Sequence, residues 1–282
     1  MVSPLAVAAM AVVLAVCVVV PLGAFAWIAT RRNAGGGRRW PGVWRAFWAG
    51  ALAFTASQWL TQIPLMTFVV PALGADVSGF LLSGPVASYT AGLFEETGRL
   101  VVMLLLLKAF HRWIDGVTFG FGHGGIEAIT LVGLTMVNNL VLAVLINAGQ
   151  WPTIAAALPQ ETADQLFTAL TTTPPATFLL AGVERLSAIS LHVACSVIVL
   201  AGIVHRRKAL AWLVAVVLHG SVNLLAVLGL AAGWPALLVE AALAAVAVAL
   251  WFGIARVRGW FSQPDAPVRA FAAPPPPQSP LP

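Results

Sequence analysis

The sequence has very little charge. Asp, Glu, Lys and Arg make up 9% of its 282 residues, whereas soluble domains carry about 25% charged residues. This shortage excludes an ordinary soluble globular protein. A hydrophobic content of 60% and a mean hydropathy of +0.93 indicate an integral membrane protein instead.

Cysteine is scarce as well. The chain has two cysteines, Cys17 and Cys195, and each lies within an apolar run. Two isolated cysteines exclude a disulfide framework and the paired spacing of a cysteine zinc motif. We therefore expect both to be small buried side chains.

Long apolar runs, by contrast, are abundant. A helix needs about 20 apolar residues to span a bilayer, and seven segments are long enough: 4–30, 44–70, 86–108, 117–147, 177–204, 209–231 and 234–255. The first has no basic residue before it and is longer than the apolar part of a signal peptide. We expect it to be a retained transmembrane helix.

The predicted fold class is therefore an all-α integral membrane protein with about seven transmembrane helices. We expect one multi-pass domain over residues 1–262, followed by a disordered, proline-rich cytoplasmic tail over residues 263–282. A short interfacial helix is predicted over residues 160–170, within the polar connection 149–176.

The Lys and Arg residues are distributed unevenly among the connections. Of the 15, 13 flank the first, third and fifth connections or follow the last segment, and the connections near 72–85, 149–176 and 231–234 have none. Because short positively charged loops stay in the cytoplasm, we predict an outer N-terminus and a cytoplasmic C-terminus. The basic residues thus mark orientation, and we expect no nucleic-acid partner.

Four of the predicted helices contain ionisable residues within their apolar runs. These residues are Glu95, Glu96 and Arg99; His123 and Glu127; Glu184, Arg185 and His192; and His219, with Asn223 four positions later. Six are normally charged, and at about 3 kcal/mol each their unpaired cost in a bilayer would be roughly 18 kcal/mol. That exceeds the stability of a typical domain, about 5–15 kcal/mol. They must pair with one another or line a wet cavity.

Counting along the chain places these residues at one depth. Glu95, His123, His192 and His219 lie 11 to 14 positions from the nearest predicted cytoplasmic basic residue. At about 1.5 Å rise per residue, each is roughly 16–21 Å from that end of its helix. The sequence therefore predicts a single site built from four helices.

Spacing within the helices also favours side chains that face one another. Glu95 and Glu96 lie four and three positions before Arg99, and His123 and Glu127 are four apart. Arg99 can hold one glutamate ionised, which leaves the other for acid or base chemistry. The glycines around His123 would let helices approach closely. A purely structural ion pair is an open alternative for Glu184 and Arg185.

Three motifs, in this order and within predicted membrane helices, resemble an intramembrane protease superfamily. It includes the CAAX prenyl proteases and bacteriocin-processing enzymes (CPBP), with PrsW as a relative. The motifs are Glu95-Glu96-x-x-Arg99, Phe119-x-x-x-His123 and His219-x-x-x-Asn223. The fuller set, with Gly122-His-Gly-Gly-Ile-Glu127-Ala, Glu184-Arg185 and His192, looks most like the YhfC branch. The resemblance covers about residues 85–225.

The resemblance implies hydrolysis of peptide bonds in membrane-embedded peptide or protein substrates. It implies that Glu95 is the general base that activates water, with Glu96 and Arg99 in support. His123 would hold or polarise the water, and His219 with Asn223 would stabilise the oxyanion. Glu127 matches a glutamate of PrsW-like proteins, and Glu184, Arg185 and His192 match positions specific to the branch.

Two mechanisms and two other classes of protein stay open. We favour a cofactor-free, glutamate-dependent reaction, but His123, His192, His219 and Glu95 would also suit a catalytic Zn²⁺. The sequence has no His-Glu-x-x-His motif. Ion- or proton-coupled transporters also carry ionisable residues in membrane helices, and a non-catalytic scaffold or immunity protein would retain the bundle without its chemistry.

Overall fold

The computed structural model describes residues 1–32, 36–37, 39–109 and 111–261. In chain order the elements are α1 (Pro4–Thr30), α2 (Val43–Phe54), η1 (Thr55–Gln62), η2 (Leu65–Val69), η3 (Val70–Leu73), α3 (Ala75–Leu81), α4 (Gly84–Leu106), α5 (Trp113–Glu127), η4 (Ala128–Gly133), α6 (Leu134–Asn147), α7 (Trp151–Ala155), α8 (Gln160–Thr172), α9 (Pro175–Val204), α10 (Lys208–Ala231), α11 (Ala236–Arg256) and η5 (Val257–Trp260). The predicted proline-rich tail, 263–282, lies outside the described residues.

The all-helical prediction is confirmed for the described residues, which contain five or six candidate membrane spans. Five helices are long and apolar enough to cross a membrane, and α3 with α4, bent by 65°, form a sixth if they count as one span. The predicted segment 44–70 is not among them. It runs through α2, η1 and η2, and its polar residues Ser57, Gln58 and Gln62 are buried inside the protein.

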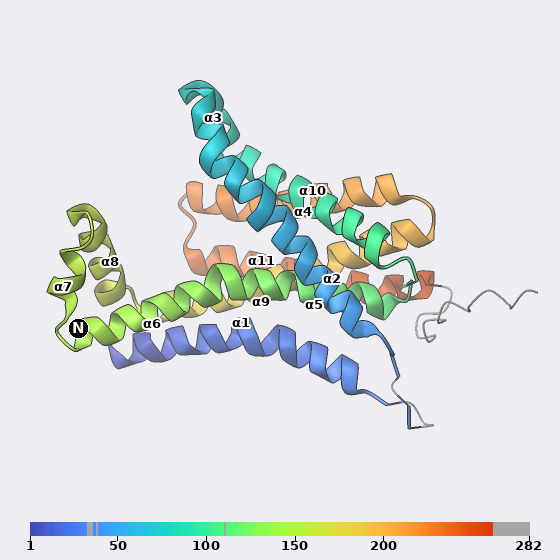
Figure 1. The fold of residues 1–282 in the computed structure, drawn as a ribbon, viewed down its shortest axis with the longest axis horizontal. Helices are drawn as coiled ribbons and strands as arrows, with labels where there is room; N and C mark the ends of the chain where they lie inside the picture. Colours follow the sequence, from blue (N-terminus) through green and yellow to red (C-terminus); the bar gives the residue numbers. More distant parts are fainter. Residues whose placement is uncertain (33–35, 38, 110, 262–282) are drawn as a thin grey trace, which may run out of the picture.

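Helix α9 forms the centre of the bundle (Figure 1). It packs against α1, α5, α10 and α11, and 72% of its most apolar stretch is buried inside the protein. Helix α5 packs against α9 and α2, and α4 packs against α10. The helices that carry the predicted site therefore meet around α9, while large apolar side chains elsewhere are exposed, as expected for a lipid-facing surface.

Glycines of α5 allow this helix to approach its two neighbours closely. A Cβ atom on Gly120 would lie 2.4 Å from the Cα atom of Val193, and one on Gly122 would lie 1.9 Å from the carbonyl oxygen of Phe47. Both distances are shorter than van der Waals contact, so no larger residue fits without moving a backbone. The expected packing role of the glycines around His123 is confirmed.

Two π-helical segments border the site. Segment η1 carries Gln58, and η4 begins directly after Glu127. An extra residue per turn changes the direction in which the following side chains point, and such segments are frequent at functional sites. Gln58 of η1 and Glu127 of α5 are both buried.

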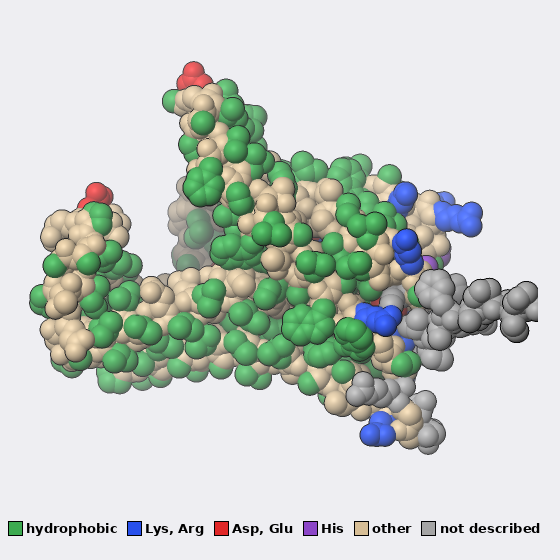
Figure 2. Space-filling view, viewed as in Figure 1, with side chains coloured by type: hydrophobic (Ala, Val, Ile, Leu, Met, Phe, Trp, Pro, Cys, Tyr) green, Lys and Arg blue, Asp and Glu red, His purple; other side chains and the backbone are tan. Residues whose placement is uncertain are grey.

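Charge separates the two ends of the molecule (Figure 2). Lys and Arg side chains gather at the end where α5 begins, whereas the acidic side chains visible on this face lie at the far tips of the α3 and α7–α8 regions. Helix α8 confirms the short helix predicted over residues 160–170. The connection near 72–85, expected as a loop, contains α3 instead.

Candidate functional site

Helices α4, α5, α9 and α10 bring the predicted ionisable residues into one buried cluster. Glu96, Arg99 and His123 have no solvent exposure, and Glu95, His192 and His219 are at most 5% exposed. The imidazole centroids of His123 and His192 are 4.6 Å apart, and those of His192 and His219 are 5.2 Å apart. The residues that were predicted to meet from four helices do form one cluster.

Arg99 and Glu96 form the ion pair at the centre of this cluster. Nε and Nη2 of Arg99 donate to the two carboxylate oxygens of Glu96 over 2.7 and 3.1 Å. The third guanidinium nitrogen, Nη1, donates to the Ser196 hydroxyl and to the His192 carbonyl oxygen. A bidentate pair with further hydrogen bonds is the arrangement that makes two buried charges tolerable.

Glu95, the neighbouring carboxylate, is held by uncharged donors. Its Oε1 accepts a hydrogen bond of 2.6 Å from the Gln58 amide, and its Oε2 lies 3.0 Å from Nε2 of His123. Two further imidazole nitrogens, Nδ1 of His192 and Nε2 of His219, lie 3.8 and 4.0 Å from the same carboxylate. Three histidines from three helices therefore converge on Glu95.

The hydrogen bonds of His192 determine which nitrogen carries its proton. Nη2 of Arg99 lies 2.9 Å from Nδ1 of His192, and a guanidinium is only a donor, so Nδ1 must accept. The proton then resides on Nε2, which contacts Oε2 of Glu127. Arg185 holds the other oxygen of Glu127 over 2.9 Å and also pairs with Glu184.

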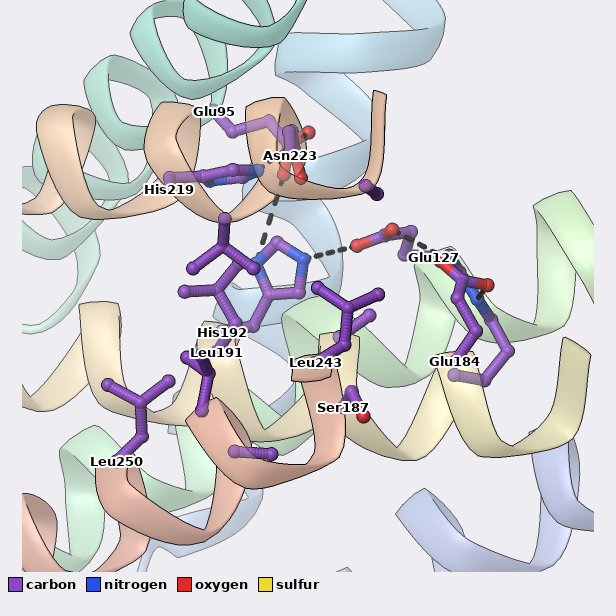
Figure 3. A pocket seen from close by; sticks show the side chains of 16 residues that line it. Glu95, Glu127, Glu184, Ser187, Leu191, His192, His219, Asn223, Leu243 and Leu250 are labelled. Carbon is purple, nitrogen blue, oxygen red and sulfur yellow. Dashed lines mark hydrogen bonds and ion pairs between the residues drawn. The ribbon is translucent and has the colours of Figure 1, made fainter. Parts of the chain in front are cut away.

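His219 is oriented in a similar way. Its Nδ1 lies 3.0 Å from Oε1 of Glu96, a carboxylate that accepts, so Nδ1 carries the proton and Nε2 faces Glu95. Asn223, one turn later, lines a cavity of about 100 Å³ together with Glu95, His192 and His219. Figure 3 shows Asn223, Glu95 and His219 at the same end of this cavity.

Reasoning from the sequence missed two polar residues of the cluster. Gln58, on η1, donates a hydrogen bond to Glu95, and Ser196, on α9, accepts one from Arg99. Only ionisable residues were counted within the predicted helices, and both of these are neutral. The available signals were two amides, Gln58 and Gln62, inside an apolar segment, and a serine four positions after His192 on the same helix face.

Two groups of three side chains in the cluster could hold a metal ion. Ligand atoms of Glu95, His123 and His192 lie within 4.8 Å of one another, as do those of Glu96, His192 and His219. Catalytic zinc takes three such His and carboxylate ligands, and outer carboxylates commonly orient the histidines, as Glu127 orients His192 here. The first trio fits zinc, provided that Nε2 of His123 gives up the proton it donates to Glu95 and that Nδ1 of His192 exchanges its hydrogen bond to Arg99. In the second, Glu96 is already paired with Arg99.

These features define a multi-pass membrane protein with a buried Glu–His–Arg site in its helical core. A family model described as YhfC intramembrane metalloprotease matches residues 16–245, and the chain belongs to this family. A relative from Bacillus subtilis (strain 168), named as the uncharacterized membrane protein YhfC, is 32% identical over 238 residues. The match covers 81% of this chain and 86% of that protein. No solved structure matches the chain.

Proposed function

We propose that the protein is an intramembrane endopeptidase that hydrolyses peptide bonds of membrane-associated substrates. The observation that carries this proposal is the environment of Glu95. Its carboxylate is buried, receives a hydrogen bond from Gln58, faces three imidazoles and borders a cavity. A carboxylate held by neutral donors beside a cavity is a suitable base for activating water. The family description supports peptidase chemistry.

In the proposed reaction, Glu95 accepts a proton from water as the water attacks the scissile carbonyl, and it returns this proton to the leaving nitrogen as the C–N bond breaks. His123, within 3.0 Å of Glu95, positions that water. The amide of Asn223 and the imidazolium form of His219, which carries a second proton on Nε2, lie at the same end of the cavity (Figure 3) and donate to the developing oxyanion. Glu96 and Arg99 do not touch the substrate; their ion pair fixes His219 and His192 around the base.

Zinc chemistry is compatible with the same residues. Glu95, His123 and His192 would hold the ion, which when bound would polarise the scissile carbonyl and favour deprotonation of the attacking water. Glu127 would hold His192 in the required tautomer, through the contact between Nε2 and its carboxylate. The metal content of active protein therefore distinguishes the zinc-dependent reaction from the cofactor-free one that we favour from the sequence.

The proposed topology has seven membrane crossings, with segment 44–70 as the second. Its helical course through α2, η1 and η2 supports this, and its buried polar residues would face the protein rather than lipid. The gathering of Lys and Arg at one end (Figure 2) supports a cytoplasmic location for that end and an outer N-terminus. The ordered motifs also support a relationship to the CPBP and PrsW proteases.

The proposal is tested by comparing the membrane proteomes of cells that express the wild type and the Glu95→Gln variant. Glutamine preserves the shape of the side chain but cannot act as a base. We expect at least one membrane peptide to stay uncut in the variant although both proteins reach the membrane in equal amounts. Identical proteomes would support a non-catalytic scaffold and would contradict the proposal.

Metal dependence is tested on purified protein. The metal content of the wild type and of the His123→Ala variant is measured beside peptidase activity, with and without a chelator. Active wild-type protein without stoichiometric metal would eliminate the zinc-dependent version. Activity that is lost on chelation and restored by zinc would eliminate the cofactor-free one.

A further inference from the structure

The cavity beside Glu95 has walls of two kinds. One end is polar and is formed by Glu95, Glu127, His192, His219 and Asn223 from α4, α5, α9 and α10. The wall contributed by α11 is entirely apolar and consists of Leu243, Val246, Ala247 and Leu250. Figure 3 shows Leu243 in front of His192 and Ser187, whereas Leu250 lies farther from the polar end.

We propose that this apolar wall is a subsite for one aliphatic substrate side chain next to the scissile bond. The inference rests on the proposed peptidase function. In a peptide, the side chain that precedes the scissile bond begins two bonds from the carbonyl carbon that water attacks. A carbonyl placed between Glu95 and Asn223 therefore has this side chain within the same small cavity, where α11 offers apolar contact.

The volume of the cavity restricts the size of that side chain. It is about 100 Å³, whereas an apolar protein cavity of about 150 Å³ binds benzene. Because the scissile peptide group shares this space, side chains from alanine to leucine should be accepted more readily than an aromatic ring. The substrate class is a membrane peptide with a small or medium aliphatic residue immediately before the cleaved bond.

Two residues of α11 offer opposite changes of the subsite. Ala247 is buried and lines the cavity, so Ala247→Leu fills part of it. Leu243 is also buried and lines the cavity, so Leu243→Ala enlarges it. The matched controls are Ala249→Leu and Leu238→Ala, which make the same chemical changes at exposed positions of the same helix.

The experiment uses the full chain in proteoliposomes with a library of transmembrane peptides. One position of each peptide is varied among Ala, Val, Leu and Phe, and the products are identified by mass spectrometry. We expect the wild type to cleave after Ala, Val or Leu at least about tenfold faster than after Phe, because size discrimination by an apolar pocket is typically about 10–200-fold.

The variants should shift this preference in opposite directions. Ala247→Leu should lower the rate after Leu relative to Ala by about tenfold or more, and Leu243→Ala should raise the rate after Phe by a similar factor. Both controls should keep the wild-type preference. If Ala247→Leu fails to accumulate in the membrane, the test rests on Leu243→Ala. The measured quantity is its cleavage rate after Phe divided by its rate after Ala, compared with the same ratio for the wild type.

The results separate this subsite from the proposed function. A wild-type protein that cuts no peptide of the library would overturn peptidase activity and the subsite with it. The subsite alone would be overturned by another result. In that case the wild type cuts peptides, but Leu243→Ala, and Ala247→Leu where it accumulates, keep the wild-type preference.

Discussion

Two buried arginines of the site, Arg99 and Arg185, each pair with glutamate, but in different surroundings. The side chains of Arg99 and its partner Glu96 have no solvent exposure. Arg185 pairs with Glu127 and Glu184 near the border of the cavity, where the Glu184 side chain is 33% exposed. His192 connects the two groups, because it accepts from Arg99 and contacts Glu127.

The difference explains how two adjacent glutamates can have different roles. Arg99 neutralises Glu96 within the core, which leaves Glu95 with the neutral donors Gln58 and His123. Arg185 does not contact Glu95 directly. It contacts Glu127, which contacts His192, and so acts on the site through these two residues. We therefore expect the Arg99 group to determine folding and the Arg185 group to tune activity.

The largest expected effect is on stability and comes from Arg99→Ala. This substitution leaves Glu96 buried without its cation, and breaking a buried ion pair in this way costs about 3–5 kcal/mol. We expect little folded protein in the membrane and a much lower melting temperature in detergent. Arg185→Ala is the comparison variant. Equal melting temperatures for the two variants would remove the distinction between the groups.

The next largest effect is expected for Glu96→Gln. Its Arg99 partner keeps hydrogen bonds to Ser196 and His192 but loses its counter-charge, so we expect a destabilisation of about 3 kcal/mol. Glu95→Gln removes no arginine pair and should melt within a few degrees of the wild type. Thermal unfolding of both variants in the same detergent checks this. A larger loss of stability for Glu95→Gln than for Glu96→Gln would mean that Glu95 is the structural glutamate and Glu96 the reactive one.

A smaller effect, on activity rather than folding, is expected for Glu127→Gln. The amide can no longer accept from His192 with a full negative charge, and losing such an orienting partner typically costs about 10–100-fold in activity or metal affinity. The cleavage rate and the melting temperature are measured side by side. A variant with the wild-type rate would show that Glu127 does not orient His192 for the reaction.

The smallest effect is expected for Glu184→Gln. Its carboxylate is partly exposed, and Arg185 retains its hydrogen bond to Glu127. Partly exposed ion pairs contribute about 0–1 kcal/mol, so stability and cleavage should stay close to the wild type. A loss as large as that of Glu96→Gln would make the two arginine groups equivalent and would contradict the comparison.

Much of the arrangement followed from the sequence because membrane helices constrain it strongly. Ionisable residues such as Glu95, His123 and His219 are costly in lipid and must face the interior, and a fixed rise per residue gives their depth. The sequence could not say which glutamate pairs with Arg99, since spacings of three and four both allow contact. That choice depends on where α9 places Ser196 and His192.

Other features depend on packing that periodicity does not describe. Gln58 lies in the π-helical segment η1 and donates to Glu95, whereas the sequence predicts one continuous apolar helix over 44–70. The wall of α11 consists of aliphatic residues, such as Leu243 and Ala247, that resemble any lipid-facing stretch in the sequence. Only the tertiary arrangement distinguishes the face that borders the cavity.

The central claim, that Glu95 rather than Glu96 performs the reaction, is tested most directly by one rate measurement. Wild-type protein and the Glu95→Gln variant are reconstituted at equal amounts, and cleavage of a membrane peptide cut by the wild type is followed over time. We predict that Glu95→Gln, although folded, yields no product above a sample with no protein added. Cleavage by this variant at the wild-type rate would contradict the account.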